Sequence, residues 1–308
     1  DKVFRQIVTI GGLSSLVILG LIALFLFYRG YEVLGKEGLD FITKADWTIS
    51  VDDSGNVTDS HFGLAAMLVG TILCALVAVV IAVPIAVFAA IFLNFYAPEW
   101  LKKPLVTVMD LMAAFPSILF GIWGFLVLMP SAEYWAKLLN KYLGWIPIFD
   151  VPAPVFTRSP FIAGMVLAIM IIPIITSVSR EVMGRVDKEL VSAASALGGT
   201  NFSTMRRVVL PTAKSGILGG ILLGLGRALG ETVAIFFVLN LVFETNWYRV
   251  LEPKGGNVAS LIVARFAEAT ASEISALMAA GVILFVLTLI VNMIATSIVQ
   301  RAERKMAS

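Results

Sequence analysis

The sequence is poor in the side chains from which catalytic and metal sites are usually built. Its 308 residues include one cysteine, Cys74, and one histidine, His61. A single cysteine excludes a disulfide framework and a cysteine-built metal site. The chain also lacks a G-x-x-x-x-G-K-[ST] phosphate loop. We therefore expect no catalytic residue, no metal ligand and no cofactor in this chain, and no ATP hydrolysis by the chain itself.

Charge is also scarce. Charged residues make up 14% of the chain, the formal net charge is +2, and no basic run with interleaved aromatic residues occurs. Nucleic acid is therefore not an expected partner. Hydrophobic residues account for 59% of the chain and the mean hydropathy is +0.93. This composition is typical of a protein embedded in a lipid bilayer.

Six segments reach the length of about 20 mostly apolar residues that a membrane-spanning helix needs. We predict one all-α membrane domain over residues 1–308 with six transmembrane helices. The predicted spans are 7–28, 64–93, 105–129, 160–179, 215–243 and 274–299. Three spans contain a proline, at Pro84, Pro116 and Pro173, where we expect kinks.

The basic residues predict the orientation of these spans. The N-terminus, the 94–104 and 180–214 connectors and the C-terminal tail together carry thirteen basic and six acidic residues. The remaining connectors carry nine basic and thirteen acidic residues. Because cytoplasmic loops are enriched in Lys and Arg, we predict that both termini and the 180–214 connector are cytoplasmic.

The 180–214 connector has the pattern of a compact helix–turn–helix. Helix formers run from Asp187 to Leu197, and the pair Gly198-Gly199 can end that helix. Thr200 is placed to cap a second short helix, which we expect Pro211 to close. The small residues of the first helix would let it dock closely into a groove on a partner. An ordinary amphipathic helix on the membrane surface is the alternative interpretation.

The fifth predicted span carries two ionisable residues, Arg227 and Glu231, in an otherwise apolar run. At about 100° per residue both fall on one helix face, four residues apart and close enough to pair. The same face carries a small-xxx-small ridge, where a second helix can approach or a passage can stay open. The ridge consists of Gly216, Gly220 and Gly224. A second set on the neighbouring face, predicted to accept a further helix, is Gly219, Gly226 and Gly230.

Two interpretations of this charged pair remain open. In the first, Arg227 and Glu231 form a structural ion pair that holds helices together. In the second, they serve transport, as intramembrane charges commonly do. The planar guanidinium of Arg227 offers donors suited to an oxyanion, and Glu231 neutralises it when the pathway is empty. A carboxylate acceptor would favour an anion that carries its own O–H, such as hydrogen phosphate, over sulfate.

Three further polar residues are weaker candidates for the pathway. Asp110, in the third predicted span, is placed to pair with Arg180, to line the cytoplasmic mouth or to make a structural hydrogen bond. Ser117, after Pro116, can offer its hydroxyl to a substrate or bond within its own helix. Thr232 directly follows the Arg–Glu motif.

The 180–214 connector resembles the EAA loop of ABC-importer permeases. In that pattern an EAA triplet is followed after three residues by Gly, and after nine more by I-x-L-P. Here it falls on Ser192-Ala193-Ala194, Gly198 and Val208-Val209-Leu210-Pro211, with every spacing kept. The resemblance implies a coupling helix that docks into the ATP-binding subunit. Ser192 replaces the Glu of the pattern, and Glu189, one turn earlier, can substitute for it. The residues implied in coupling are Glu189, Ser192, Ala193, Ala194, Leu197, Gly198, Leu210 and Pro211.

Two other segments are similar to phosphate-specific transport permeases: "VVLPTAKSGILGGILLGLGRALGETVA" and "DLMAAFPSILFGIWGF". The resemblance covers essentially the whole chain, and the long first external loop is like that of the PstC-type subunit. It implies a type I ABC-importer permease fold in the bacterial or archaeal plasma membrane. It further implies a second, PstA-type permease, a dimer of ATP-binding subunits carrying ATP and Mg, and an external phosphate-binding protein. Arg227 and Glu231 would be required for phosphate passage.

Alternative functions follow from the same residues. One is a permease for another oxyanion, such as molybdate or sulfate. Another is an ion-coupled secondary transporter or channel that uses Arg227 and Glu231 as a proton or anion site, although the sequence has no obvious inverted repeat. A phosphate-sensing scaffold would leave no separate mark in the sequence.

Overall fold

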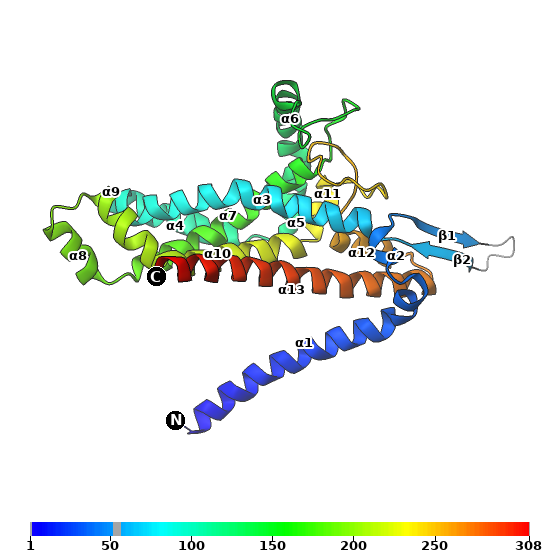
Figure 1. Ribbon diagram of the computed structural model, residues 1–308, viewed down its shortest axis with the longest axis horizontal. Helices are drawn as coiled ribbons and strands as arrows, with labels where there is room; N and C mark the ends of the chain where they lie inside the picture. The colour runs from blue at the N-terminus through cyan, green and yellow to red at the C-terminus, as the bar shows by residue number, and fades with distance from the viewer. Residues whose placement is uncertain (1, 52–56, 308) are drawn as a thin grey trace.

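The computed structural model describes residues 2–51 and 57–307 and is predominantly α-helical. Four long helices lie side by side along the longest axis of the molecule (Figure 1): α3 (Ala65–Ile91), α7 (Pro160–Gly184), α10 (Leu210–Gly230) and α13 (Ala271–Ala307). A two-stranded hairpin lies at one end of this bundle, and α8 (Lys188–Ala196) with α9 (Asn201–Thr204) lies at the other. We call these the hairpin end and the α8 end.

The centre of the bundle is the contact between α3 and α7. α3 presents a row of buried alanines to it, which allows the two backbones to approach closely, as is common between membrane helices. A Cβ added at Gly164 would lie 2.5 Å from Cβ of Val77, so this crossing requires glycine. Pro84 and Pro173 both lie inside continuous helices.

The helices reproduce the predicted number of spans. Within residues 2–51 and 57–307, six helical segments are long and apolar enough to cross a membrane. Their bounds are Lys2–Glu37, Ala65–Tyr96, Ser117–Leu143, Pro160–Gly184, Asn201–Gly230 and Ala271–Ser297. The predicted all-α membrane fold with six spans is therefore confirmed.

The third predicted span, 105–129, differs from the structure. The chain breaks at Phe115, which takes an extended conformation (φ −65°, ψ 139°) because the residue before a proline is disfavoured in the helical region. Pro116 therefore ends a helix rather than kinking one. The pieces are α4 (Glu99–Ala114), α5 (Ser117–Trp123), the π-helical η2 (Gly124–Leu128) and α6 (Met129–Leu143). α4 packs beside α7 and α5 beside α11 (Val233–Val238), whereas α6 projects away from the bundle (Figure 1).

The start of the fifth span also differs from the prediction. Pro211 does not close the second helix of the connector but occupies the first turn of α10. A proline in a first turn is tolerated because its missing N–H would have no intrahelical partner there. The π-helical η3 (Met205–Val209) joins α9 to α10, so one helical segment runs from Asn201 to Gly230.

The first long connector folds into small elements at the hairpin end. α2 (Asp40–Thr43) leads into β1 (Trp47–Val51), which pairs antiparallel with β2 (Val57–Phe62). The ring of Trp47 stacks on Phe243, and its Nε1 donates a hydrogen bond to Oε1 of Glu273 at 2.9 Å. The hairpin is thereby attached to the start of α13.

Three helices remain to be placed: η1, α12 and the N-terminal α1. η1 (Phe92–Tyr96) extends α3, and α12 (Val258–Phe266) precedes α13. α1 (Lys2–Glu37) approaches α13 near Gly30, where an added Cβ would lie 2.7 Å from Cα of Ala279. From that crossing α1 diverges from the bundle (Figure 1), and nearly all of its large apolar side chains are exposed.

Candidate functional site

The glycine ridge of α10 packs against α7, so close approach of a second helix, one of the two uses predicted for this ridge, is the one that the chain shows. A Cβ added at Gly220 would lie 3.0 Å from Cγ1 of Val178, and one at Gly224 would lie 2.8 Å from Cδ1 of Ile175. At Gly216 it would overlap the side chain of Val182. The ridge therefore holds α10 tightly on α7, and Arg227 follows one turn beyond it, close to the middle of α7.

Arg227 is half-buried in the last turn of α10. Its Nε lies buried without a hydrogen-bond partner. No carboxylate of a described residue forms an ion pair with its guanidinium, and Glu231 is among those described. A charged group in a membrane helix with unused donors is free to bind a transient anion.

Glu231 does not continue the helical face that the sequence predicted. α10 ends at Gly230, and Glu231 is extended, with φ −71° and ψ 132°. Its Oε1 accepts a hydrogen bond from the backbone N of Ala234 at 3.3 Å, which satisfies a donor in the first turn of α11. The predicted Arg227–Glu231 ion pair is therefore wrong for this conformation, because the break in the helix removes the i,i+4 geometry. Glu231 is nonetheless buried, with 8% of its surface exposed.

Thr232 completes the break between α10 and α11. Its Oγ1 donates to the carbonyl oxygen of Gly230 at 3.3 Å, and its own carbonyl accepts from Oγ of Ser260 in α12 at 3.0 Å. The structure places Arg227, Glu231 and Thr232 around one helix break. Thr232 stabilises the break, and its hydroxyl is committed to the backbone.

Asp110 and Ser117 lie on the third, divided span. Asp110 is exposed on α4 and accepts a 3.5 Å hydrogen bond from Oγ of Ser177 on α7. Among described residues its partner is thus Ser177, and the predicted pairing with Arg180 does not occur. Ser117 is half-buried at the start of α5, directly after the break at Pro116. Among the described residues, neither forms a hydrogen bond or an ion pair with Arg227.

The second glycine set leaves one face of α10 open in this chain. A Cβ added at Gly219 or Gly230 would meet nothing within 4 Å, and one at Gly226 would lie 4.0 Å from Nδ2 of Asn292 on α13. These distances refer to the part of the chain that the structure describes. Within one copy of the chain, the further helix predicted for this face is present only near Gly226.

The coupling segment is an exposed helix at the α8 end that lies within the predicted range 187–197, and Thr200 caps the second helix as predicted. The side chain of Asp187 accepts from the backbone N of Glu189 at the start of α8, and Thr200 accepts from the N of Ser203 at the start of α9. Gly198 has φ +83°, a conformation that favours glycine. No described residue of α8 is buried, and the adjoining Leu197 is 91% exposed. The coupling residues of α8 and its C-cap therefore form an uncovered surface, whereas Leu210 and Pro211 belong to α10.

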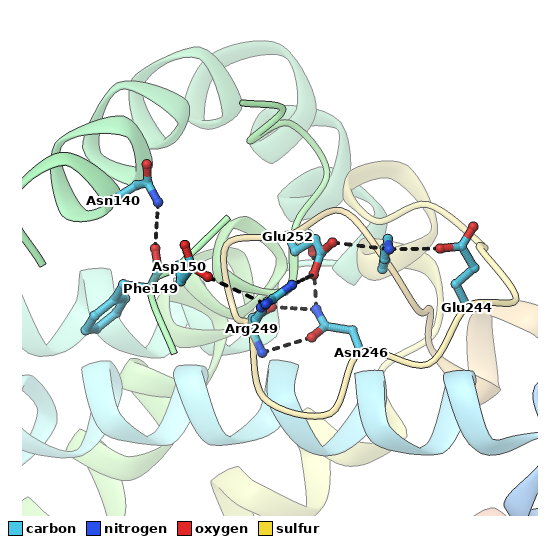
Figure 2. A network of polar contacts seen from close by, with 8 residues as sticks. Asn140, Phe149, Asp150, Glu244, Asn246, Arg249 and Glu252 are labelled. Atoms are coloured by element: carbon cyan, nitrogen blue, oxygen red, sulfur yellow. Dashed lines mark hydrogen bonds and ion pairs between the residues drawn. The ribbon is translucent and has the colours of Figure 1, made fainter. Parts of the chain in front are cut away.

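Two connectors at the hairpin end are tied together by a polar network (Figure 2). Arg249 contacts Asp150 at 3.5 Å and Glu252 at 3.6 Å. Lys254 contacts Glu252 at 3.3 Å and Glu244 at 3.0 Å. The hydrogen bond with Glu244, supported by Glu252, raises the pKa of Lys254 above its ordinary value. The basic residues of this network are therefore neutralised by carboxylates.

Sequence reasoning overlooked Arg158, which precedes α7. It is the one described residue other than glycine with a positive φ, at 53°. In the sequence Arg158 was only one of nine basic residues in the connectors predicted to be external. The predicted span 160–179 begins two residues after Arg158, and nothing in that prediction indicated the strained backbone.

The chain matches a known family of transport proteins. Residues 82–307 match the family described as "Binding-protein-dependent transport system inner membrane component". The chain belongs to this family, and it is a multi-pass component of a membrane transport system rather than a catalytic subunit. The predicted resemblance to ABC-importer permeases is confirmed.

Relatives of similar length share a more specific name. The chain is 37% identical over 308 residues to the phosphate transport system permease protein PstC of Xylella fastidiosa (strain 9a5c), covering 99% of this chain and 92% of the relative. It is 37% identical to the PstC protein of Pasteurella multocida over 99% of this chain and 93% of that protein. It is also 34% identical to the probable PstC protein of Methanocaldococcus jannaschii over 94% of this chain and 90% of that protein.

Solved structures of ABC transporters share the fold at low sequence identity. A bacterial ABC transporter involved in the import of the acidic polysaccharide alginate aligns with a TM-score of 0.54 and 15% identity, covering 98% of this chain and 99% of that chain. The MetNI methionine ABC transporter in an inward-facing conformation aligns with a TM-score of 0.51 and 15% identity, covering 78% and 94%. At this identity the likeness supports the permease fold alone.

Proposed function

We propose that this chain is a pore-forming permease subunit of an ATP-driven importer of inorganic phosphate. Relatives that align with nearly its whole length are named phosphate permeases. The observation that carries the proposal is the half-buried guanidinium of Arg227, which no described carboxylate neutralises and whose Nε has no partner. A passing oxyanion supplies the acceptor oxygens that this group lacks.

In this proposal Arg227 binds phosphate only transiently. A guanidinium donates two parallel hydrogen bonds to an oxyanion, and such charge-assisted bonds are about twice as strong as neutral ones. Glu231 lies four residues further along the chain, buried beside the same helix break. Its carboxylate has a free oxygen besides the one that caps α11. That oxygen accepts the O–H of hydrogen phosphate, which sulfate lacks at neutral pH.

ATP hydrolysis belongs to a separate pair of ATP-binding subunits that carry ATP and Mg. The exposed α8 and Leu197 supply the surface that docks onto them. The N- and C-terminal ends of the chain lie toward the α8 end in Figure 1, which supports the predicted cytoplasmic side. The hairpin end then faces the external phosphate-binding protein.

A second permease, of the PstA type, completes the pathway. The open face of α10 at Gly219 and Gly230 supports this part of the proposal. So does α1, whose apolar side chains are exposed along most of its length. The bilayer and the second permease together would cover these surfaces.

Reconstituted transport tests the proposal. The complex of this chain with its second permease, ATP-binding subunits and binding protein is placed in proteoliposomes, and ATP-dependent uptake of labelled phosphate is measured. Arg227→Gln is expected to lower uptake by about 10- to 100-fold, because a hydrogen bond to a charged group contributes about 1.5–3 kcal/mol. Arg227→Lys is expected to retain partial uptake, since it keeps the charge but not the planar donors.

The controls separate transport from assembly and cargo. Arg265→Gln removes an exposed cation of α12 and should leave uptake unchanged. Loss of complex assembly in Arg227→Gln would return Arg227 to a structural role. If sulfate or molybdate outcompetes phosphate, that oxyanion is the transported substrate. Uptake without the ATP-binding subunits would contradict the ATP-driven mechanism.

A further inference from the structure

Arg158 is held in a strained position at the hairpin end of the bundle. Its φ of 53° is rare for a residue with a Cβ and persists only where surrounding contacts enforce it. Nη1 donates to Oδ1 of Asn240 at 3.0 Å, and the guanidinium carbon lies 5.3 Å from the centre of the Phe125 ring. The next residues are anchored as well, because the N of Phe161 donates to the carbonyl of Val250 at 2.8 Å.

The charge of Arg158 differs from that of the nearby basic residues. Arg249 and Lys254 each contact two carboxylates (Figure 2). Arg158 has only an amide oxygen and an aromatic ring as its partners, and no carboxylate among the described residues forms an ion pair with it. Its positive charge is thus available to a ligand.

That charge lines a cavity. The cavity has a volume of about 360 Å³, several times the share of one water molecule in the liquid. Its walls come from η2, from the segment before α7, and from α11 with the residues that follow it. The lining includes Phe125, Arg158, Phe236, Phe237, Leu239 and Asn240, of which Arg158 alone is charged. Arg158 and the amide of Asn240 are the polar groups of this lining, so a small anion that enters the hollow would bind at the Arg158 guanidinium.

The cavity is connected through α11 to the helix break that carries Arg227. Phe236 and Phe237 of the cavity wall belong to α11, and Glu231 caps the first turn of the same helix. A helix of six residues is about 9 Å long. Arg158 therefore lines the cavity near the C-terminal end of α11, whereas the helix break that follows Arg227 adjoins the N-terminal end of α11.

We propose that Arg158 forms an entry site for tetrahedral oxyanions, where phosphate released at the hairpin end binds before it reaches Arg227. Asn240 and Phe125 orient the guanidinium, and the strained backbone keeps it at the cavity. Binding there is weak, since the cavity is partly open and the anion must move on. This inference rests on the proposed function, because it assigns a second residue of the same pathway.

The test measures phosphate imported per ATP hydrolysed in the reconstituted complex. Arg158→Gln is expected to lower this ratio by about tenfold, the factor for loss of one hydrogen bond to a charged group. ATP hydrolysis stimulated by the phosphate-loaded binding protein should stay at the wild-type level. Arg158→Lys should restore much of the ratio. Lys141→Gln, which removes a cation of α6 that lies over its neighbour Tyr142 and outside this cavity, is the matched control.

A second variant tests the role of Arg158 if the complex with Arg158→Gln does not assemble. Asn240→Asp keeps Arg158 but places a carboxylate against its guanidinium, and it should lower the ratio to a similar extent. Wild-type ratios in both variants would overturn the inference. Parallel loss of uptake and of stimulated ATP hydrolysis would also overturn it, because Arg158 would then contact the binding protein. Failure of the wild-type complex and the Lys141→Gln control to import phosphate would instead refute the proposed function.

Discussion

At the scale of single residues, the chain places charge inside an apolar bundle in two different ways. The carboxylate of Glu231 is partly satisfied by a backbone N–H at the start of α11. The guanidinium of Arg227 is left with an unpaired Nε. Because a half-buried charge without a carboxylate partner is costly, its presence at this position favours the proposal that transport uses it. The sequence identified both residues, but the predicted ion pair between them was wrong, because that prediction assumed that α10 continues past Gly230.

Glu231→Gln separates the capping role of this residue from its proposed role in selectivity. The amide oxygen of Gln can still accept from the N of Ala234, so assembly and thermal stability are expected to match the wild type. Loss of the negative charge should lower the preference for phosphate over sulfate by about tenfold, the factor for one hydrogen bond to a charged group. Competition between labelled phosphate and sulfate during uptake measures this preference.

Two outcomes would contradict this account of Glu231. One is an unchanged preference for phosphate in Glu231→Gln. The other is a large loss of stability in this variant, which would indicate that the carboxylate has a structural partner besides Ala234. Glu231→Ala, which also loses the cap, should cost about 1 kcal/mol more than Glu231→Gln.

At the scale of helices, glycine spacing decides which faces pack within the chain and which remain open. Gly216, Gly220 and Gly224 lie against α7, whereas Gly219 and Gly230 face open space. Both sets were visible in the sequence as stripes on a helical wheel. Which stripe α7 would cover was not predictable, because each has the small residues that close packing requires. The sequence also did not predict the break at Pro116. It showed only a proline there, and the prolines of the neighbouring spans lie inside continuous helices.

A pair of alanine substitutions tests this assignment of faces. Gly216→Ala places a methyl group into the side chain of Val182 and should destabilise the folded chain by about 1–3 kcal/mol, the usual cost of overpacking. Gly219→Ala adds the same methyl group where nothing lies within 4 Å. It should be neutral or slightly stabilising, because alanine favours the helix over glycine. Thermal unfolding of the two variants of the purified chain in detergent measures the difference, and equal stabilities would contradict the packing.

At the scale of the whole molecule, the proposed coupling surface and the entry site lie at opposite ends of one bundle. α7 links them directly: Arg158 precedes its first residue and α8 follows its last. α10 runs beside it from the α8 end and terminates at the helix break beyond Arg227. A movement of docked ATP-binding subunits would therefore reach the pathway through tightly packed helices, which transmit strain well.

Leu197→Asp tests this coupling. The side chain is exposed in the isolated chain, so folding should be unaffected. The substitution would place a charge in the groove of the ATP-binding subunit, and an unpaired charge is costly in an interface. Stimulated ATP hydrolysis and phosphate uptake should therefore both fall by more than about tenfold. Ser195→Asp adds the same charge on the opposite face of α8 and serves as the control. Normal uptake in Leu197→Asp, or equal losses in both variants, would contradict the proposed docking face.

Composition and periodicity alone determined the membrane class, the number of spans, the distribution of basic residues, the glycine ridge and the short helix that became α8. These properties are local, since each follows from the residues of a single segment. The coupling role proposed for α8 rests on the resemblance to the EAA loop. The tertiary structure decided that the helix breaks after Gly230, that Pro116 divides a span, and that Arg158 lies in a cavity with Asn240 and Phe125. The break after Gly230 and the position of Arg158 involve contacts between segments far apart in the chain, which no single segment reveals. The break at Pro116 has a local cause, but the sequence could not distinguish it from Pro84 and Pro173, which lie inside helices.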